Sequence, residues 1–334
     1  MKKKLGLLML AAMLIMGLNN VSSGADHPIT TVYNISAPFG TSAYLLSSAL
    51  DDISKKHHPW LRINHSETPG LVYNIRKLSK EPELKKNTFF TVTRGLDWLA
   101  QRGLSPYKEK HPGSLLIANY NLGVTWLATL NPDIKSAQDL VGKKIALGRT
   151  TQVIWGCEVD WLIKLGWGLD KKIKIQYVGV NEAPKALLDG LVDAAIIGGY
   201  VDPINWKFIP GPPTLEFLNS GKKIYHIPWG SDAVKKTIAG NIKIVPLTLP
   251  AKTVKDQNSD LEVFADPISW VAYSEFPADI CYEITKMIIQ NVSAFKEYHA
   301  LGGLMAPGAL PYGWDPDTIH PGALRAYKEA GILK

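Results

Sequence analysis

The segment 148–155 carries the side chains best suited to binding chemistry in this sequence. A short apolar run at 144–147 leads into Arg149, Thr150, Thr151 and Gln152, and a helical pattern follows. A strand that passes through such a loop into a helix places free backbone N–H groups and the positive end of the helix dipole beside the guanidinium. The segment therefore predicts a site for an anionic group, and a carboxylate gripped by two hydrogen bonds from Arg149 fits best.

Four further loops of similar character follow other predicted strands. Hydroxyl groups, glycines and aromatic rings dominate all of them. Hydroxyls and backbone amides hold ligand oxygens, and rings cover apolar parts of a ligand, so these loops indicate binding and not catalysis. The predicted ligand-binding residues are Phe39, Thr41, Ser42, Tyr44, Thr68, Gly70, Tyr73, Thr93, Arg94, Arg149, Thr150, Thr151, Gln152, Trp155, Gly199 and Tyr200.

Each of these residues also has a purely structural interpretation. Arg149 could be a solvated charge, although cations are disfavoured at a helix N-terminus. Arg94 could cap its strand or pair with the nearby Asp97. Thr41 could cap the helix that follows it, which is compatible with ligand contact, and Trp155 is as consistent with a core position as with a pocket wall.

Patterns for catalysis or metal binding are absent from the sequence. It contains no G-x-S-x-G, C-x-x-C or H-E-x-x-H motif, and its histidines fall outside the predicted loops. Cys157 and Cys281 lie far apart within helix-like patterns, which favours two free, packed thiols over a disulfide. We therefore expect no enzymatic activity, no cofactor and no metal site.

Hydrophobic periods that alternate between 2 and 3.6 residues indicate the elements that position the loops. The order strand, polar loop, helix, strand occurs over 30–94 and recurs over 140–199. Parallel strands joined by crossover helices need cover on both faces, so two such modules predict two α/β lobes. Ligands bind at the carboxyl ends of strands in such sheets, where all five loops fall. A strand pattern at 264–274 returns the chain to the first lobe.

The first 25 residues have the features of a secretory signal. Three lysines precede an apolar run at 5–17, and Ser23-Gly24-Ala25 is a small-residue cleavage site. We expect cleavage after Ala25 and a periplasmic protein, because the apolar run is shorter than the roughly 20 residues of a membrane-spanning helix. Removal of the segment lowers the net charge from +7 to +4. The basic residues are scattered, so nucleic acid is not an expected partner.

The chain resembles the TAXI family of extracytoplasmic solute receptors, which serve tripartite TRAP transporters. The resemblance rests on DLVGKKIALGRTTQ, on the segment 162–203, on FPADICYEITKMI and, most specifically, on HPGALRAYKEAGI. It implies a type II periplasmic-binding-protein fold, with two α/β lobes joined by a hinge and a ligand cleft between them. The expected parts are a signal peptide at 1–25, lobe I at 26–118 plus 242–334, and lobe II at 119–241.

The resemblance also implies a function and partners. The expected protein is a monomeric receptor that captures a small, carboxylate-bearing solute and delivers it to a TRAP permease in the membrane. The sequence departs from the family in the first loop and at 149–152, so the solutes of better-known members, such as glutamate, do not carry over. Alternatives are a receptor for an ABC importer or a sensor kinase, and a structural surface protein that binds no solute.

Overall fold

One mixed sheet runs through the described chain, and its two halves face different sets of helices. The computed structural model describes residues 28–334, so the predicted signal segment 1–25 lies outside the described residues. The strand order is β2-β1-β3-β11-β4-β7-β5-β6, with β8, β9 and β10 attached at the side. The strands are β1 (Thr30–Ile35), β2 (Leu61–Ser66), β3 (Thr88–Thr93), β4 (Leu115–Thr129), β5 (Lys144–Leu147), β6 (Lys174–Tyr177), β7 (Ala194–Asp202), β8 (Lys207–Pro210), β9 (Tyr225–Ile227), β10 (Val245–Leu249) and β11 (Leu261–Ala272).

Helices and short helical turns connect these strands. The α-helices are α1 (Ser42–His57), α2 (Leu71–Lys80), α3 (Arg94–Arg102), α4 (Cys157–Trp161), α5 (Glu182–Leu188), α6 (Pro212–Leu218), α7 (Ser231–Ala239), α8 (Ala278–Gln290), α9 (Phe295–Tyr298) and α10 (Pro321–Glu329). The 3-10 turns are η1 (Pro82–Lys86), η2 (Ala137–Leu140), η3 (Val153–Trp155), η5 (Val292–Ala294), η6 (Ala300–Leu304), η7 (Pro307–Ala309) and η8 (Pro316–Thr318), and η4 (Leu162–Trp167) is a π-helix.

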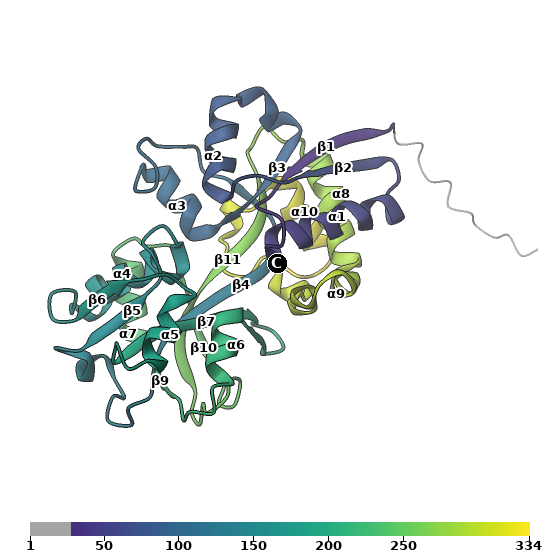
Figure 1. Ribbon diagram of the computed structural model, residues 1–334. Coiled ribbons are helices and arrows are strands. Elements are labelled where there is room, and N and C mark those ends of the chain that lie inside the picture. The colour runs from purple at the N-terminus through teal and green to yellow at the C-terminus, as the bar shows by residue number, and fades with distance from the viewer. Residues whose placement is uncertain (1–27) are drawn as a thin grey trace, which may run out of the picture.

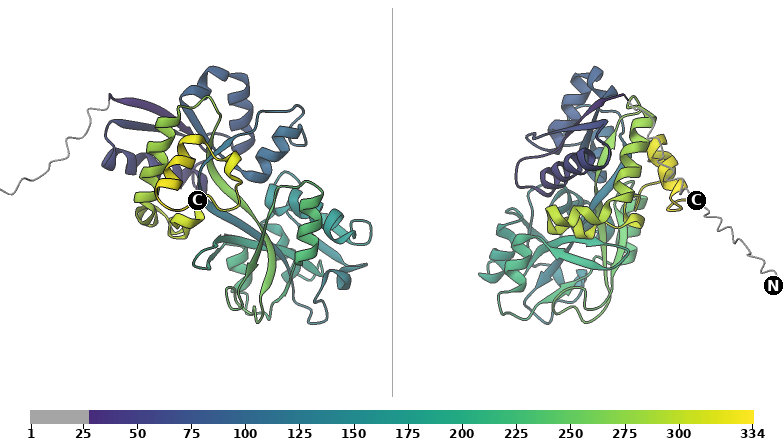
Figure 2. Two further views of the ribbon diagram at one scale, coloured as in Figure 1. Left: turned by 180° about the vertical axis from the view of Figure 1, so that it is seen from behind. Right: turned by 90° about the vertical axis from the view of Figure 1, so that its right-hand side faces the viewer.

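The long strands β4 and β11 connect two α/β lobes, as predicted. They run antiparallel to each other between an upper and a lower group of elements (Figure 1). We call the upper group lobe I: it holds the parallel strands β2-β1-β3 with α1, α2, α3, α8, α9 and α10. We call the lower group lobe II: it holds β5 to β9 with α4 to α7. The two further views show the same separation, with the C-terminal helices packed on lobe I (Figure 2).

After α7 the chain forms β10, which packs with elements of lobe II. β10 pairs antiparallel with the first half of β11, from Leu261 to Ala265, and α7 packs against β10. The second half of β11 pairs with β3 of lobe I. The chain thus passes from one lobe to the other within β11.

The prediction of one continuous helix after the 148–152 loop is wrong. The structure has three short helical segments there. η3, α4 and η4 follow one another, with Gly156 between the first two. A β-carbon at Gly156 would come within 2.2 Å of the Arg149 carbonyl oxygen. The chain therefore folds back tightly on its own loop at this glycine, and a continuous helix cannot form through it.

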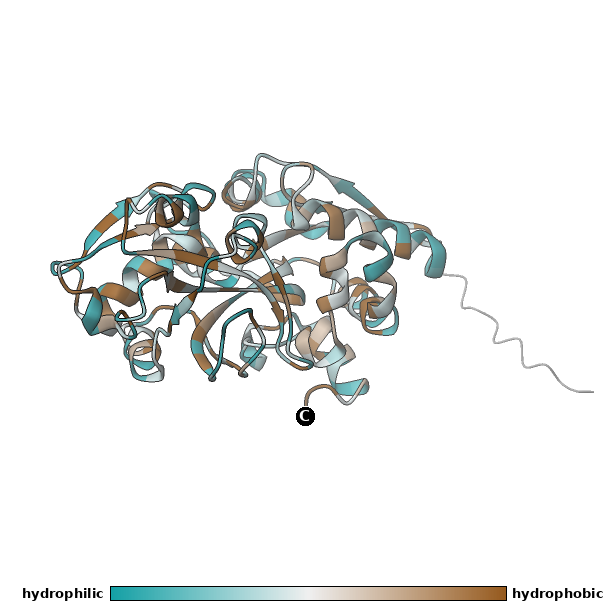
Figure 3. Ribbon diagram, turned by 60° about the horizontal axis from the view of Figure 1, so that its bottom comes forward, coloured by the Kyte–Doolittle hydropathy of each residue, from teal (hydrophilic) through white to brown (hydrophobic). Residues whose placement is uncertain are grey.

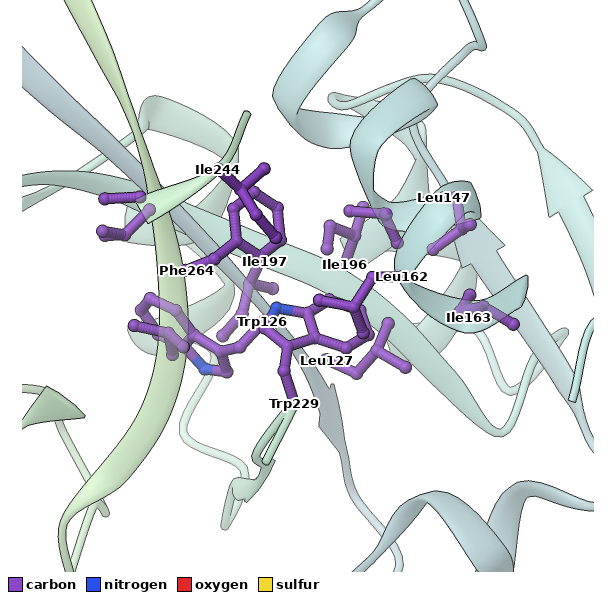
Figure 4. Packing of buried hydrophobic residues seen from close by; sticks show 14 of the residues in the cluster. Trp126, Leu127, Leu147, Leu162, Ile163, Ile196, Ile197, Trp229, Ile244 and Phe264 are labelled. Carbon is purple, nitrogen blue, oxygen red and sulfur yellow. The ribbon is translucent and has the colours of Figure 1, made fainter. Parts of the chain in front are cut away.

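The core of lobe II is built around large aromatic side chains that the strands and helices enclose (Figure 4). Trp126, Trp229 and Phe264 are fully or almost fully buried. The Trp229 indole N–H donates to the Thr125 carbonyl oxygen at 2.6 Å, which satisfies its polar atom inside the core. Aliphatic residues of β5, β7 and η4 belong to the same cluster, which continues into lobe I through buried residues of β3 and α3.

Helices cover the sheet with one apolar face each, as their sequence period requires. Figure 3 shows hydrophilic residues alternating with hydrophobic ones along the helices. The stripe predicted as core on the helix after β11 is confirmed: Ile284, Met287 and Ile288 are fully buried, and Ile280 and Val292 pack against the same cluster. No helix in the described part of the chain is long and apolar enough to cross a membrane.

Candidate ligand-binding site

Two of the predicted hydroxyl groups shape the loops that follow β1 and β2. The Thr41 hydroxyl accepts a hydrogen bond from the Tyr44 amide at 3.2 Å and donates to the Pro38 carbonyl oxygen at 2.7 Å. It caps α1, as its structural interpretation predicted. The Thr68 hydroxyl donates to the Ser36 carbonyl oxygen at 2.8 Å and is buried. Both hydroxyls hold these loops in place.

An aromatic cluster lies at the tip of the first loop. The Phe39 side chain is 73% exposed, and its ring meets Tyr44 edge-on with 5.1 Å between centroids. Tyr44 in turn packs edge-on against His65 of β2 at 4.7 Å. The Glu67 carboxylate accepts the Phe39 amide hydrogen at 2.9 Å, which joins the first two loops. Phe39 is therefore the ring of this cluster most accessible to a ligand.

The second loop and α2 contribute to a cavity that belongs to lobe I alone. Tyr73 is 43% exposed, and together with Thr68 it lines a cavity of about 290 Å³ beside β1. Gly70 precedes α2 with a φ of +135°, a backbone conformation that favours glycine. The buried Asn74 amide donates to the carbonyl oxygens of Ser36 and Thr91, at 2.6 and 3.1 Å. It fixes the carboxyl ends of β1 and β3 side by side.

At the end of β3, the predicted pair Thr93 and Arg94 serves the helix and the C-terminal segment. The Thr93 hydroxyl accepts the Leu96 amide hydrogen at 3.2 Å and caps α3. The Arg94 guanidinium lies 3.1 Å from the Asp315 carboxylate and 5.7 Å from the centre of the Trp314 ring. Burial lowers the pKa of Arg94 from its usual value. The suggested pairing with Asp97 on the same helix is not formed: Arg94 binds a residue far along the chain.

In lobe II, Gln152 organises the loop from which the anion site was predicted. Its side-chain oxygen accepts the amide hydrogens of Arg149 at 2.8 Å and Val180 at 3.2 Å. Arg149, Thr150 and Thr151 are all exposed. In residues 28–334 no carboxylate lies within 4 Å of the Arg149 guanidinium. Gln152 therefore shapes the loop, and Arg149 forms no ion pair within this range, although the Glu182 carboxylate and the Arg149 Nε both lie close to Gly179, 2.4 and 3.6 Å from a β-carbon built there.

Three further predicted residues lie on or near β7 and η3. Trp155 is half-buried, and its ring edge would lie 3.8 Å from a β-carbon built on Gly211. A β-carbon at Gly199 would meet the Ile209 carbonyl oxygen at 2.3 Å, so this glycine allows β8 to pair closely. Tyr200 packs against the core of lobe I. Burial raises the pKa of the Tyr200 hydroxyl, and a hydrogen bond with Ser42 opposes this effect. Tyr200 and Ser42 thus link β7 to α1.

A pair of acidic residues that the sequence analysis did not select lies at the junction of the lobes. Glu158 of α4 and Asp266 of β11 are 3% and 0% exposed. The Asp266 carboxylate accepts the Gly95 amide hydrogen at 3.0 Å. Burial raises the pKa of Asp266 to about 6, and burial next to Asp266 raises the pKa of Glu158 well above its usual value. Each residue is a single acid within an apolar pattern, IWGCEV or VFADPI, and this was the available signal.

Two of the elements that carry these residues meet where the lobes join. α3 packs against η3, which brings the end of β3 next to the end of the 148–155 loop (Figure 1). Cys157 and Cys281 are free, and burial raises their thiol pKa values to about 11 and 12, so neither is an activated nucleophile. No cluster of potential metal ligands occurs in the described residues. The arrangement suits binding.

Comparisons with known proteins agree with this architecture. A family model described as the NMT1-like family matches residues 35–331. The chain is similar in structure to a TctC solute-binding protein from Polaromonas, at 12% identity and a TM-score of 0.52, covering 91% of this chain and 98% of that one. This likeness shows the fold, with two α/β lobes of the periplasmic-binding-protein type.

Two further solved structures are more distant. Rpa4515 of R. palustris, solved with adipate, has 14% identity and a TM-score of 0.48, covering 92% of this chain and 95% of that one. MatC of Rhodopseudomonas palustris, solved with malate, has 12% identity and a TM-score of 0.47, covering 91% and 97%. With TM-scores below 0.5, these two similarities give no information about the ligand of the present chain.

Proposed function

This chain belongs to the NMT1-like family, and on that premise we propose that it is an extracytoplasmic solute-binding receptor of a membrane transporter. The observation that carries the proposal is the contact of α3 in lobe I with η3 in lobe II, which brings together two of the predicted polar segments, one from each lobe. Such a junction can close on a ligand when the connecting strands bend. The absence of an activated nucleophile or metal cluster in residues 28–334 supports binding over catalysis.

We propose a TRAP permease as the partner, with this chain as a TAXI-type receptor. Support comes from the sequence segments that resemble the TAXI family, above all the segment around α10. A receptor for an ABC importer or a sensor kinase is the second candidate. The neighbouring genes distinguish them: a fused TRAP permease supports the first, and an ATPase or a kinase supports the second.

The proposed solute is a small organic molecule with a carboxylate. Arg149 supports this choice, because its guanidinium is exposed and has no carboxylate partner in the described chain. Desolvation of an arginine in a closing cleft is costly unless an opposite charge meets it. Thr150 and Thr151 add neutral donors beside it.

We further propose that β4 and β11 form the hinge. In this assignment lobe I holds residues 26–118, lobe II begins at 119, and the chain returns to lobe I within β11. The pairing of β10 with the first half of β11 supports this later return over a boundary at 242.

A ligand screen followed by solution scattering tests the proposal. Organic acids, amino acids and aromatic carboxylates are screened by thermal shift, and small-angle scattering is recorded with and without the best ligand. A ligand that contacts both lobes stabilises their closed arrangement, so we expect a higher Tm and a smaller radius of gyration. No stabilising compound would contradict a receptor role. Tight binding at an unchanged radius would contradict closure.

A further inference from the structure

The two buried acids make a direct contact between lobe II and lobe I. Glu158 belongs to α4, and one of its carboxylate oxygens lies 1.7 Å from where a β-carbon at Gly95 would be. Gly95 is the second residue of α3, and its amide donates to Asp266 at 3.0 Å. A side chain of lobe II therefore rests on the backbone of lobe I, at a position where only glycine leaves room for it. Asp266, in the strand that connects the lobes, touches both.

The contact lacks the partners that two carboxylates would need. Among the described residues, no donor bonds either oxygen of Glu158 or the second oxygen of Asp266. Two adjacent buried negative charges are strongly disfavoured. One proton held between them converts the repulsion into a short, charge-assisted hydrogen bond. The Gly95 amide at the α3 N-terminus and Arg94 favour negative charge, and so stabilise the one charge that remains when the two carboxyls share a single proton.

The charged groups around the pair are few. On α3, Arg94 lowers the pKa of Asp266, but its guanidinium is engaged by Asp315. On α4, Cys157 is a neutral thiol, and Asp160 is held by the Tyr177 hydroxyl. The facing residues of β4, 122–125, and those of η3 carry no ionisable side chain. A base that could take the shared proton is thus absent from the described surroundings.

We propose that Glu158 and Asp266 share one proton and act as a latch, so that closing of the lobes takes up a proton and opening releases it. This inference rests on the hinge motion proposed above and adds a control by pH to the same junction.

The sign of the effect follows from the two states. With the lobes apart, both carboxyls meet water and have pKa values near their usual range of about 4. In the contact, burial raises both pKa values, that of Asp266 to about 6. The closed form thus binds more protons. The shared proton therefore stabilises the closed form fully below about pH 4, and this stabilisation is lost as the pH rises through the raised pKa values. The ratio of closed to open molecules falls by up to about tenfold per pH unit in that range.

Solution scattering of the protein without solute, across this pH range, tests the latch. In the wild type we expect the radius of gyration to increase as the pH rises. In Glu158→Gln the side-chain amide donates to Asp266 without a titrating proton, so we expect a compact form at every pH. Glu216→Gln, at an exposed carboxylate on α6 of the same lobe, is the matched control and should titrate like the wild type. Equal profiles for wild type and Glu158→Gln would overturn the proposal.

A second measurement tests for the shared proton in the wild type, so that the result does not depend on whether Glu158→Gln folds. Infrared spectroscopy of the wild type near neutral pH should show the C=O band of a protonated carboxyl group, and Glu158→Gln should lack it. A wild type without this band would also overturn the latch. Compaction of the wild type by a solute at fixed pH reports on the receptor function separately, so a failed latch and a failed receptor give different results.

Discussion

At the scale of single residues, the two arginines predicted for the site have different roles. Arg94 is mostly buried, paired with Asp315 and stacked near Trp314, so it fastens the C-terminal segment to α3. Arg149 is exposed, and its backbone amide donates to the Gln152 side chain. An arginine already neutralised within the fold gains little from an added carboxylate. Arg149 is therefore the better candidate for a ligand contact.

Removal of the Arg149 guanidinium should weaken solute binding strongly. For the best ligand of the screen, we expect Arg149→Ala to cost about 2–5 kcal/mol of binding free energy, since one partner of a buried charge pair is lost. Arg149→Lys should restore only part of this, because lysine lacks the planar fork. Isothermal calorimetry gives the values. Arg62→Ala, at an exposed arginine of β2, is the control and should bind normally. Equal affinity for wild type and Arg149→Ala would exclude Arg149 from the site.

A methyl group at Gly95 should displace Glu158. Alanine is the better helix former by about 1 kcal/mol, yet its β-carbon would lie 1.7 Å from the Glu158 carboxylate. We expect Gly95→Ala to lower the free energy of unfolding by about 1–3 kcal/mol in the wild type, as overpacking does. In a Glu158→Ala background the same change should be close to neutral. Urea unfolding of the four proteins measures this, and an equal cost in both backgrounds would show that Glu158 does not rest on Gly95.

At the scale of elements, caps and core faces fix where each loop leaves the sheet. α1 and α3 begin at the capping residues Thr41 and Thr93, directly after the β1 loop and β3. α3 ends at Gly103, whose φ of +66° is the left-handed conformation of a helix end. The predicted loops after β1 and β3 are therefore helix N-termini, whose first amide groups are partly satisfied by the Thr41 and Thr93 hydroxyls.

The packing of β11 should contribute strongly to stability. Phe264 is fully buried and lies 6.2 Å from the Trp229 ring, measured between centroids. We expect Phe264→Ala to lower the free energy of unfolding by about 3–5 kcal/mol through the cavity it leaves. Phe39→Ala is the control at an exposed ring and should change it by less than about 0.5 kcal/mol. Urea unfolding measures both, and a small effect at Phe264 would contradict the described core.

At the scale of the whole molecule, two strands join the lobes and side chains bridge them. β4 and β11 pair along most of their length, so bending must be shared by both. Tyr200 of β7 interacts with Ser42 of α1, and Glu158 of α4 contacts Gly95 of α3. Both contacts must rearrange when the lobes separate. Each bridge is polar, and polar bridges can exchange with water more cheaply than a packed core.

Export should remove the first 25 residues. We expect the protein recovered from a periplasmic extract to begin at Asp26, because Ala25 ends the small-residue segment after the apolar run. N-terminal sequencing checks this. Recovery of a chain that still begins at Met1 from the membrane fraction would contradict the predicted cleavage and support a retained anchor.

The features that could be predicted from the amino-acid sequence are those that depend on residues close together in the chain. The alternation of periods predicted β1, α1, β2, α2 and β3 in order, and with the second module it predicted two α/β lobes, which the structure confirms. The capping role of Thr41 could also be predicted from the sequence, because its hydrogen-bonding partner is only three residues away. Such features follow from backbone geometry and side-chain spacing within one turn or one strand.

The contacts between side chains at the junction of the lobes became known from the three-dimensional structure alone. Arg94 lies 221 residues from its partner Asp315, and Gly95 lies 171 residues from Asp266. In the sequence, Glu158 and Asp266 are isolated acids in apolar segments. They meet only because β11 and α4 pack against α3. Their burial and the proton proposed between them arise from close approaches between distant segments, whereas the break in the helix at Gly156 comes from a close approach to Arg149 in its own loop. Local periodicity contains no information about such approaches, because they depend on how complete elements pack.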